Sequence, residues 1–129
     1  MTPMARFLSE NALNKVSTDL SFLTKAVLES NGELDLQIRP DDRLNIYYQG
    51  NSLAEIAIRS NDYAIKVHYK FGLSEAIEKL QPNIMSKLNI TNQGNYQTVN
   101  VPPDLIHPCL QLSVRRRLIS KIKEVNNGE

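Results

Sequence analysis

The sequence predicts a single α+β domain over residues 1–129, built as a four-stranded antiparallel meander with N- and C-terminal helices packed on one face. Residues 33–70 contain four short stretches of alternating apolar and polar residues, separated by turn residues, which is the pattern of half-buried strands. Segments with apolar residues at steps of three and four lie on both sides of them, as in amphipathic helices. The 129 residues, 41% hydrophobic and 22% charged, suit one globular domain.

The first element is a helix with one apolar stripe. The stripe comprises Leu13, Val16, Leu20, Leu23 and Val27. Ser9 or Asn11 can cap its start, and Asn31-Gly32 supplies the left-handed residue that ends it. Such a stripe is typical of a helix that packs on a sheet, and the alternative is a dimer seam.

Four strands are predicted at residues 33–39, 44–49, 53–58 and 63–70. The connections at 40–42, 50–52 and 60–62 are short, so consecutive strands must be antiparallel neighbours. One face of this sheet is apolar and the other polar, as expected when helices cover one side only.

The second half of the chain returns to helical spacing. Residues 73–80 suit a short helix that Pro82 interrupts, and residues 84–88 can form another turn or two. Residues 92–95 resemble a loop, and residues 96–101 form a candidate extra strand outside the four-stranded meander. A final helix has a buried stripe of Val114, Leu118, Ile122 and Val125. The predicted core is Leu20, Leu23, Val27, Leu34, Leu36, Ile38, Ile46, Ile56, Ile58, Ile65, Val67, Leu118 and Ile122.

Keeping the apolar residues on one face also predicts the polar face. Pairing Ile46 with Ile56 places Asp35, Tyr47, Glu55 and Lys66 in one row across the strands, with His68 in the next row beside Leu53. We interpret the row as cross-strand charge pairing. The alternative is a metal-dependent nuclease, in which Asp35 and Glu55 hold Mg²⁺ and Lys66 positions water, although one intervening strand separates the carboxylates by about 10 Å.

The sequence offers few residues for a metal site, a nucleophilic site or a phosphate loop. Cys109 is the only cysteine and is expected to be a small core residue; the two histidines leave little for a metal cluster. The five glycines are scattered and form no phosphate loop. We therefore expect no catalytic residues, no metal and no cofactor. No apolar run is long enough to span a bilayer, and the chain start lacks a signal-peptide core, so we expect a cytoplasmic protein without a membrane partner.

Positive charge gathers at the end of the chain. Residues 1–111 carry ten Lys and Arg against twelve Asp and Glu, whereas residues 112–129 carry five against two. The five cations are Arg115, Arg116, Arg117, Lys121 and Lys123. Arginine presents forked donors that suit phosphates, so this helix is a candidate nucleic-acid-binding surface; a solvated helix face is the alternative.

The sheet face is the weaker candidate for nucleic acid. Glu33, Asp35 and Glu55 would meet phosphates there beside the lysines, and Tyr47 is the only aromatic platform predicted on it. We therefore expect nucleic acid, if bound, to contact the C-terminal helix.

Residues 34–39 and 44–53 resemble the amino-terminal part of a group of uncharacterised bacterial proteins, some of which are similar to the PD-(D/E)xK nuclease superfamily. The resemblance covers about a quarter of the chain and transfers no catalytic motif. It implies a non-catalytic, nucleic-acid-associated accessory domain that serves a nuclease or defence system. The alternative is a protein–protein interaction or homo-oligomeric module that uses the open sheet face or the first helix.

Overall fold

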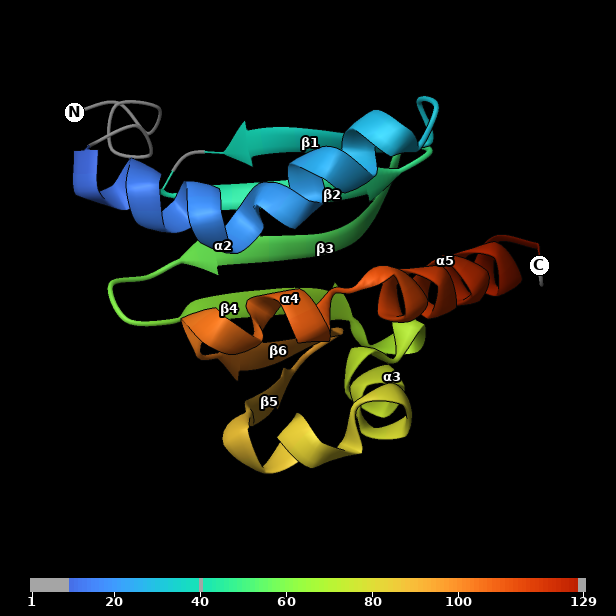
Figure 1. Ribbon diagram of the computed structural model, residues 1–129. Coiled ribbons are helices and arrows are strands. Elements are labelled where there is room, and N and C mark those ends of the chain that lie inside the picture. The colour runs from blue at the N-terminus through green and yellow to red at the C-terminus, as the bar shows by residue number, and fades with distance from the viewer. Residues whose placement is uncertain (1–9, 40, 128–129) are drawn as a thin grey trace.

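The computed structural model describes residues 10–39 and 41–127, with the side chains of residues 18–39 and 41–126, and it forms an α+β fold with an open antiparallel sheet (Figure 1). The helices and strands are α2 (Glu10–Glu29), β1 (Leu34–Arg39), β2 (Arg43–Tyr48), β3 (Asn51–Ile58), β4 (Tyr63–His68), α3 (Leu73–Leu80), β5 (Asn89–Gln93), β6 (Tyr96–Val101), α4 (Ile106–Cys109) and α5 (Leu112–Asn127), with short 3₁₀ turns at Tyr69–Phe71, Pro82–Lys87 and Pro103–Leu105.

The sheet has six strands, in the order β1-β2-β3-β4-β6-β5, so the prediction of four strands is wrong. The meander β1 to β4 forms as predicted, but β6 then pairs antiparallel with the outer edge of β4. β5 pairs with β6 across a two-residue turn at Gly94 and Asn95, so residues 92–95 include the end of a strand. β6 buries Val99 and Val101, whereas β5 has only Ile90 half-buried and therefore lacks the alternation that marks a strand.

The pairing of β2 with β3 also differs from the prediction. A two-residue turn joins them, with Gln49 and Gly50 at φ 47° and 81°. Positive φ at both central residues is the geometry of the tight hairpin turn that matches strand twist. The register then shifts at a bulge next to Ile46, which pairs with Ala54 and not with Ile56. The predicted pairs of β1 with β2 and of β3 with β4 are confirmed.

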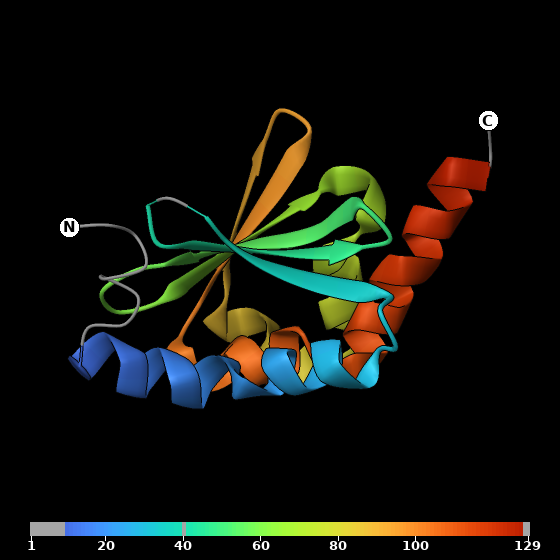
Figure 2. The same cartoon turned by 90° about the horizontal axis from the view of Figure 1, so that it is seen from above.

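The helices lie against one face of the sheet and leave the other face open (Figure 2). α2 and α4 run beneath the strands, and α5 starts in this layer and extends along one end of the sheet. α2 ends as predicted, because Asn31 and Gly32 adopt positive φ. Of its predicted stripe, Leu20 and Leu23 are buried. The side chains of Leu13, Val16 and the cap candidate Asn11, and all of the cap candidate Ser9, lie outside the described residues.

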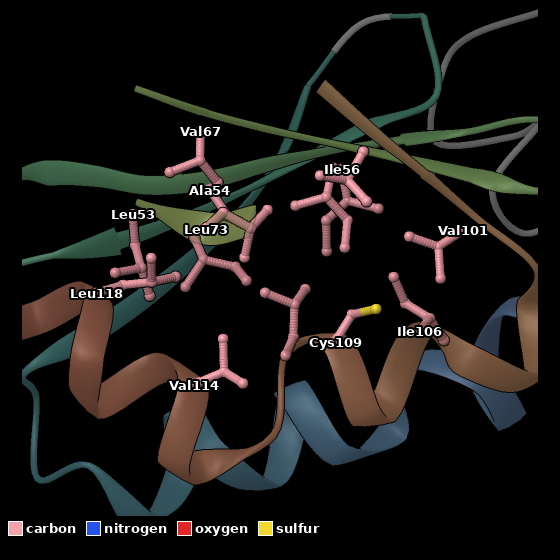
Figure 3. Packing of buried hydrophobic residues seen from close by; sticks show 14 of the residues in the cluster. Leu53, Ala54, Ile56, Val67, Leu73, Val101, Ile106, Cys109, Val114 and Leu118 are labelled. Atoms are coloured by element: carbon pink, nitrogen blue, oxygen red, sulfur yellow. The ribbon is translucent and has the colours of Figure 1, made fainter. Parts of the chain in front are cut away.

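The core lies between the sheet and the helices (Figure 3). Eight predicted members are buried: Leu20, Leu23, Ile46, Ile56, Ile65, Val67, Leu118 and Ile122. Val27, Leu34, Leu36 and Ile58 are only half-buried. Ile38 is 40% exposed, which corrects the prediction, since β1 is an edge strand of the sheet. Val114 and Cys109 are buried as predicted, and burial raises the pKa of the Cys109 thiol to about 12.

Candidate nucleic-acid interface

The five cations of α5 do not share one surface. Arg115 is only 8% exposed, and its Nη1 donates a hydrogen bond to the backbone carbonyl of Leu110 at 2.8 Å. Burial and the nearby charge of Arg116 lower the pKa of Arg115, while Glu29 opposes them. Arg115 therefore caps the C-terminal end of α4 from inside the fold. The prediction that Arg115 is one of the surface cations is wrong, and four cations remain at the surface of α5.

The other four cations form what we call the α5 surface: Arg116, Arg117, Lys121 and Lys123. Arg116 and Lys123 are exposed, and Arg117 and Lys121 are half-exposed. Lys121 contacts Glu124 at 3.7 Å, and Lys123 Nζ lies 5.9 Å from the ring centre of Tyr48. These contacts are loose, so the long side chains stay available to an anionic ligand.

Across the open sheet face, the register produces a different row from the predicted one. Glu55 lies opposite Asn45 on one side and Lys66 on the other, as the pairs of β2, β3 and β4 require. Asp35 lies opposite Tyr47 in the next row. Its carboxylate accepts a hydrogen bond at 3.0 Å from Gln37, which lies in the Glu55 row opposite Asn45. The prediction that Tyr47 faces Glu55 is therefore wrong, because the bulge and tight turn between β2 and β3 shift the register.

The same shift moves Leu53 to the helix-covered face. Leu53 is fully buried, whereas the sequence placed it outside, beside His68. His68 instead lies opposite Tyr96 of β6. Asn45 lies on the open face in the row of Glu55 but is only 7% exposed, and its Nδ2 donates to the Tyr47 hydroxyl at 3.0 Å.

The carboxylates considered for a metal site are not brought together. Glu55 accepts from Arg43 Nη1 at 2.7 Å, and Asp35 lies in a different row. Among the residues whose placement is described, no group of three or more His, Cys, Asp or Glu gathers around a point where a metal could sit. The arrangement thus gives no support to the nuclease alternative built on Asp35, Glu55 and Lys66.

A groove of about 510 Å³ opens on this face, and we call it the sheet groove. It is lined by Arg43, Glu55, Ala57, Arg59, Ala64, Lys66, Gln93, Tyr96 and Thr98. Ala57 and Ala64 lie opposite each other on β3 and β4, and their small side chains leave the hollow. Three cations and one carboxylate therefore surround a shallow floor.

The groove arginines are held in place by acids. Arg43 pairs with Glu55, and Arg59 Nε lies 2.9 Å from Asp62 Oδ1. Each pair engages one nitrogen of a guanidinium that has five N–H donors, so both arginines can bind a further anion. Lys66 Nζ sits 4.6 Å from the ring centre of Tyr96.

An aromatic cluster lies at the Tyr96 end of the groove. His68 stacks on Tyr69 with ring centres 5.0 Å apart, and it meets Tyr96 edge-on at 5.6 Å. Tyr69 and Tyr96 are both largely exposed. This cluster has no signal in the sequence, because it depends on the pairing of β4 with β6, two strands separated by α3 and β5 along the chain.

No protein-family model, curated protein or solved structure matches this chain. Within the described part of the chain, no helix has the length and apolar character needed to cross a membrane.

Proposed function

We propose that this protein is a non-catalytic nucleic-acid-associated module, an accessory domain of a nuclease or defence system. The observation that carries the proposal is the α5 surface, where Arg116, Arg117, Lys121 and Lys123 reach solvent within three turns of one helix. Within α5, Glu124 is the one carboxylate among these cations, and Glu29 and Glu33 line a hollow with Arg116. Cations at this density neutralise backbone phosphates and release condensed counterions, which drives binding without sequence preference.

The test is fluorescence anisotropy with labelled mixed-sequence duplex DNA, single-stranded DNA and RNA over a range of salt concentrations. The parent should bind with an affinity that falls as salt rises. The double variant Arg116→Ala/Arg117→Ala should bind every sequence more weakly, and its logarithmic salt slope should be smaller by about two, since each lost phosphate contact removes about one.

A matched control is Lys25→Ala/Lys87→Ala, which removes two exposed cations from α2 and from the 3₁₀ turn before β5. We expect this variant to keep the parent's affinity and slope. If the parent binds neither DNA nor RNA at low salt, the nucleic-acid proposal is wrong.

The second candidate function is a homo-oligomeric module. Two observations favour it: β1 leaves an open strand edge on which Ile38 is 40% exposed, and Leu28 and Leu112 are exposed on α2 and α5. Open edges and exposed apolar side chains are sites where chains associate. A mass that rises with concentration in light scattering, together with no nucleic-acid binding, would select this candidate.

A further inference from the structure

We propose that the sheet groove binds a short segment of single-stranded nucleic acid, with phosphates on its cations and a base stacked on its aromatic end. This inference rests on the proposed nucleic-acid function and deepens it by naming the kind of strand and the residues that select it. Lys123 of the α5 surface lies beside Tyr48, and none of the four α5 cations lines the groove, so the two surfaces contribute separate sets of side chains.

The phosphates have defined partners. Arg43 of β2, Lys66 of β4 and Arg59, which directly follows β3, line one hollow. Glu55 reduces the net charge, but its carboxylate is already satisfied by Arg43 at 2.7 Å and also fixes the guanidinium. A guanidinium held in this way loses less conformational entropy when it binds a phosphate than a free one does.

The bases have an aromatic platform. Tyr96 lines the groove and is 45% exposed, and His68 supports it from the side. Lys66 Nζ lies over one face of the Tyr96 ring, 4.6 Å from its centre, so a base would stack on the other face, with the cation across the ring from it. Bases of a single strand can be splayed out and stacked on such a ring, whereas paired bases in a duplex cannot, and this selects the single strand.

The floor supplies the room. Because Ala57 and Ala64 face each other, this part of the floor carries only methyl groups, and Glu55, Lys66 and Thr98 form the next row toward Tyr96. Thr98 and Gln93 offer hydrogen-bonding groups at the rim. The volume of about 510 Å³ lies in the range of pockets that hold small ligands, which suits a nucleotide unit.

The experiment measures binding of a labelled single-stranded oligonucleotide, an abasic strand of the same length and a duplex. We expect the parent to bind the base-containing strand more tightly than the abasic one. Tyr96→Ala should weaken binding of the single strand by about ten-fold, as expected for one lost stacking contact, and leave duplex binding unchanged. Tyr96→Phe keeps the ring and should bind within about two-fold of the parent.

Ala57→Leu fills the groove without changing charge or aromatic content, and it should weaken single-strand binding while duplex binding persists. Tyr47→Ala, on the same face but outside the groove, is the matched control and should bind as the parent does. Equal affinity for the abasic and base-containing strands, or unchanged binding by both Tyr96→Ala and Ala57→Leu, would overturn the sheet-groove proposal and leave the α5 proposal standing. A parent that binds no nucleic acid overturns both.

Discussion

The α5 surface and the sheet groove are both cationic, but they hold their charges differently. Among the described residues, the surface cations of α5 form one ion pair with a carboxylate, the 3.7 Å contact of Lys121 with Glu124. In the groove, acids hold Arg43 at 2.7 Å and Arg59 at 2.9 Å, and Lys66 rests on an aromatic ring. The convex surface therefore offers mobile charge for long-range attraction, whereas the concave one offers fixed charge beside a stacking platform.

This difference has a measurable consequence. Binding through α5 should weaken steeply as salt rises, because it depends on counterion release. Binding through the groove should retain more affinity at high salt, because stacking on Tyr96 is not screened. The four changes below test this comparison, from the largest expected effect to the smallest.

Leu53→Ala tests the bulge between β2 and β3. Leu53 is fully buried and packs against the helix layer near Leu118 (Figure 3), so its loss should cost about 2–5 kcal/mol of unfolding free energy. Ser52→Ala, at the preceding exposed position, should change stability by less than about 0.5 kcal/mol. Urea denaturation compares them. If both variants lose equally little unfolding free energy, Leu53 lies on the open face and the pairing of Glu55 with Asn45 is wrong.

Arg115→Ala tests the division of α5 into an interior and a surface. Arg115 is buried and donates to Leu110, so we expect a loss of about 1.5–3 kcal/mol from the charged hydrogen bond. Arg116→Ala, one residue along, should stay within about 0.5 kcal/mol of the parent. Thermal and urea unfolding measure both. Similar stabilities for the two variants would mean that Arg115 belongs to the α5 surface after all.

Leu53 and Arg115 also show how much of the structure could be predicted from the sequence. Period-two alternation located β1 to β4, and it placed Asp35 opposite Tyr47 and Glu55 opposite Lys66. It could not anticipate that Gln49 would adopt a positive φ, and this turn together with the bulge changed the register of one strand pair. The burial of Arg115 could not be predicted either, because its partner is a backbone carbonyl, which leaves no signal in the sequence.

The groove was beyond prediction for a related reason. β5 is nearly all polar, and β6 joins the sheet only after α3 and β5 have intervened along the chain. Tyr96 and His68 become neighbours through that long-range pairing. Local patterns report how a segment folds, but they do not report which distant edge it will join.

Tyr47→Phe tests the limit of the site on the open face. The Tyr47 hydroxyl accepts from Asn45 at 3.0 Å and from Arg39 at 3.2 Å. Removing it leaves the buried Asn45 amide without this acceptor, so we expect a loss of about 1 kcal/mol in stability. Binding of a single strand should not change, because Tyr47 is outside the groove lining. A binding defect in a folded variant would show that the site extends along β2 from Arg43 to Tyr47.

Glu55→Gln should have the smallest effect on stability. It distinguishes the two surfaces because it should raise single-strand affinity and leave duplex affinity unchanged. Glu55 pairs with Arg43 on a partly exposed surface, so breaking the pair should cost no more than about 1 kcal/mol in stability. The substitution removes the one carboxylate among the described residues of the groove lining, and it frees the Arg43 guanidinium. The removal of a negative charge from the groove should outweigh the loss of the geometry that Glu55 gives Arg43, so single-strand affinity should rise by up to about five-fold, while duplex affinity through α5 stays constant. Weaker single-strand binding would show instead that Arg43 needs Glu55 to hold its geometry, and equal gains for strand and duplex would show that both ligands share one surface.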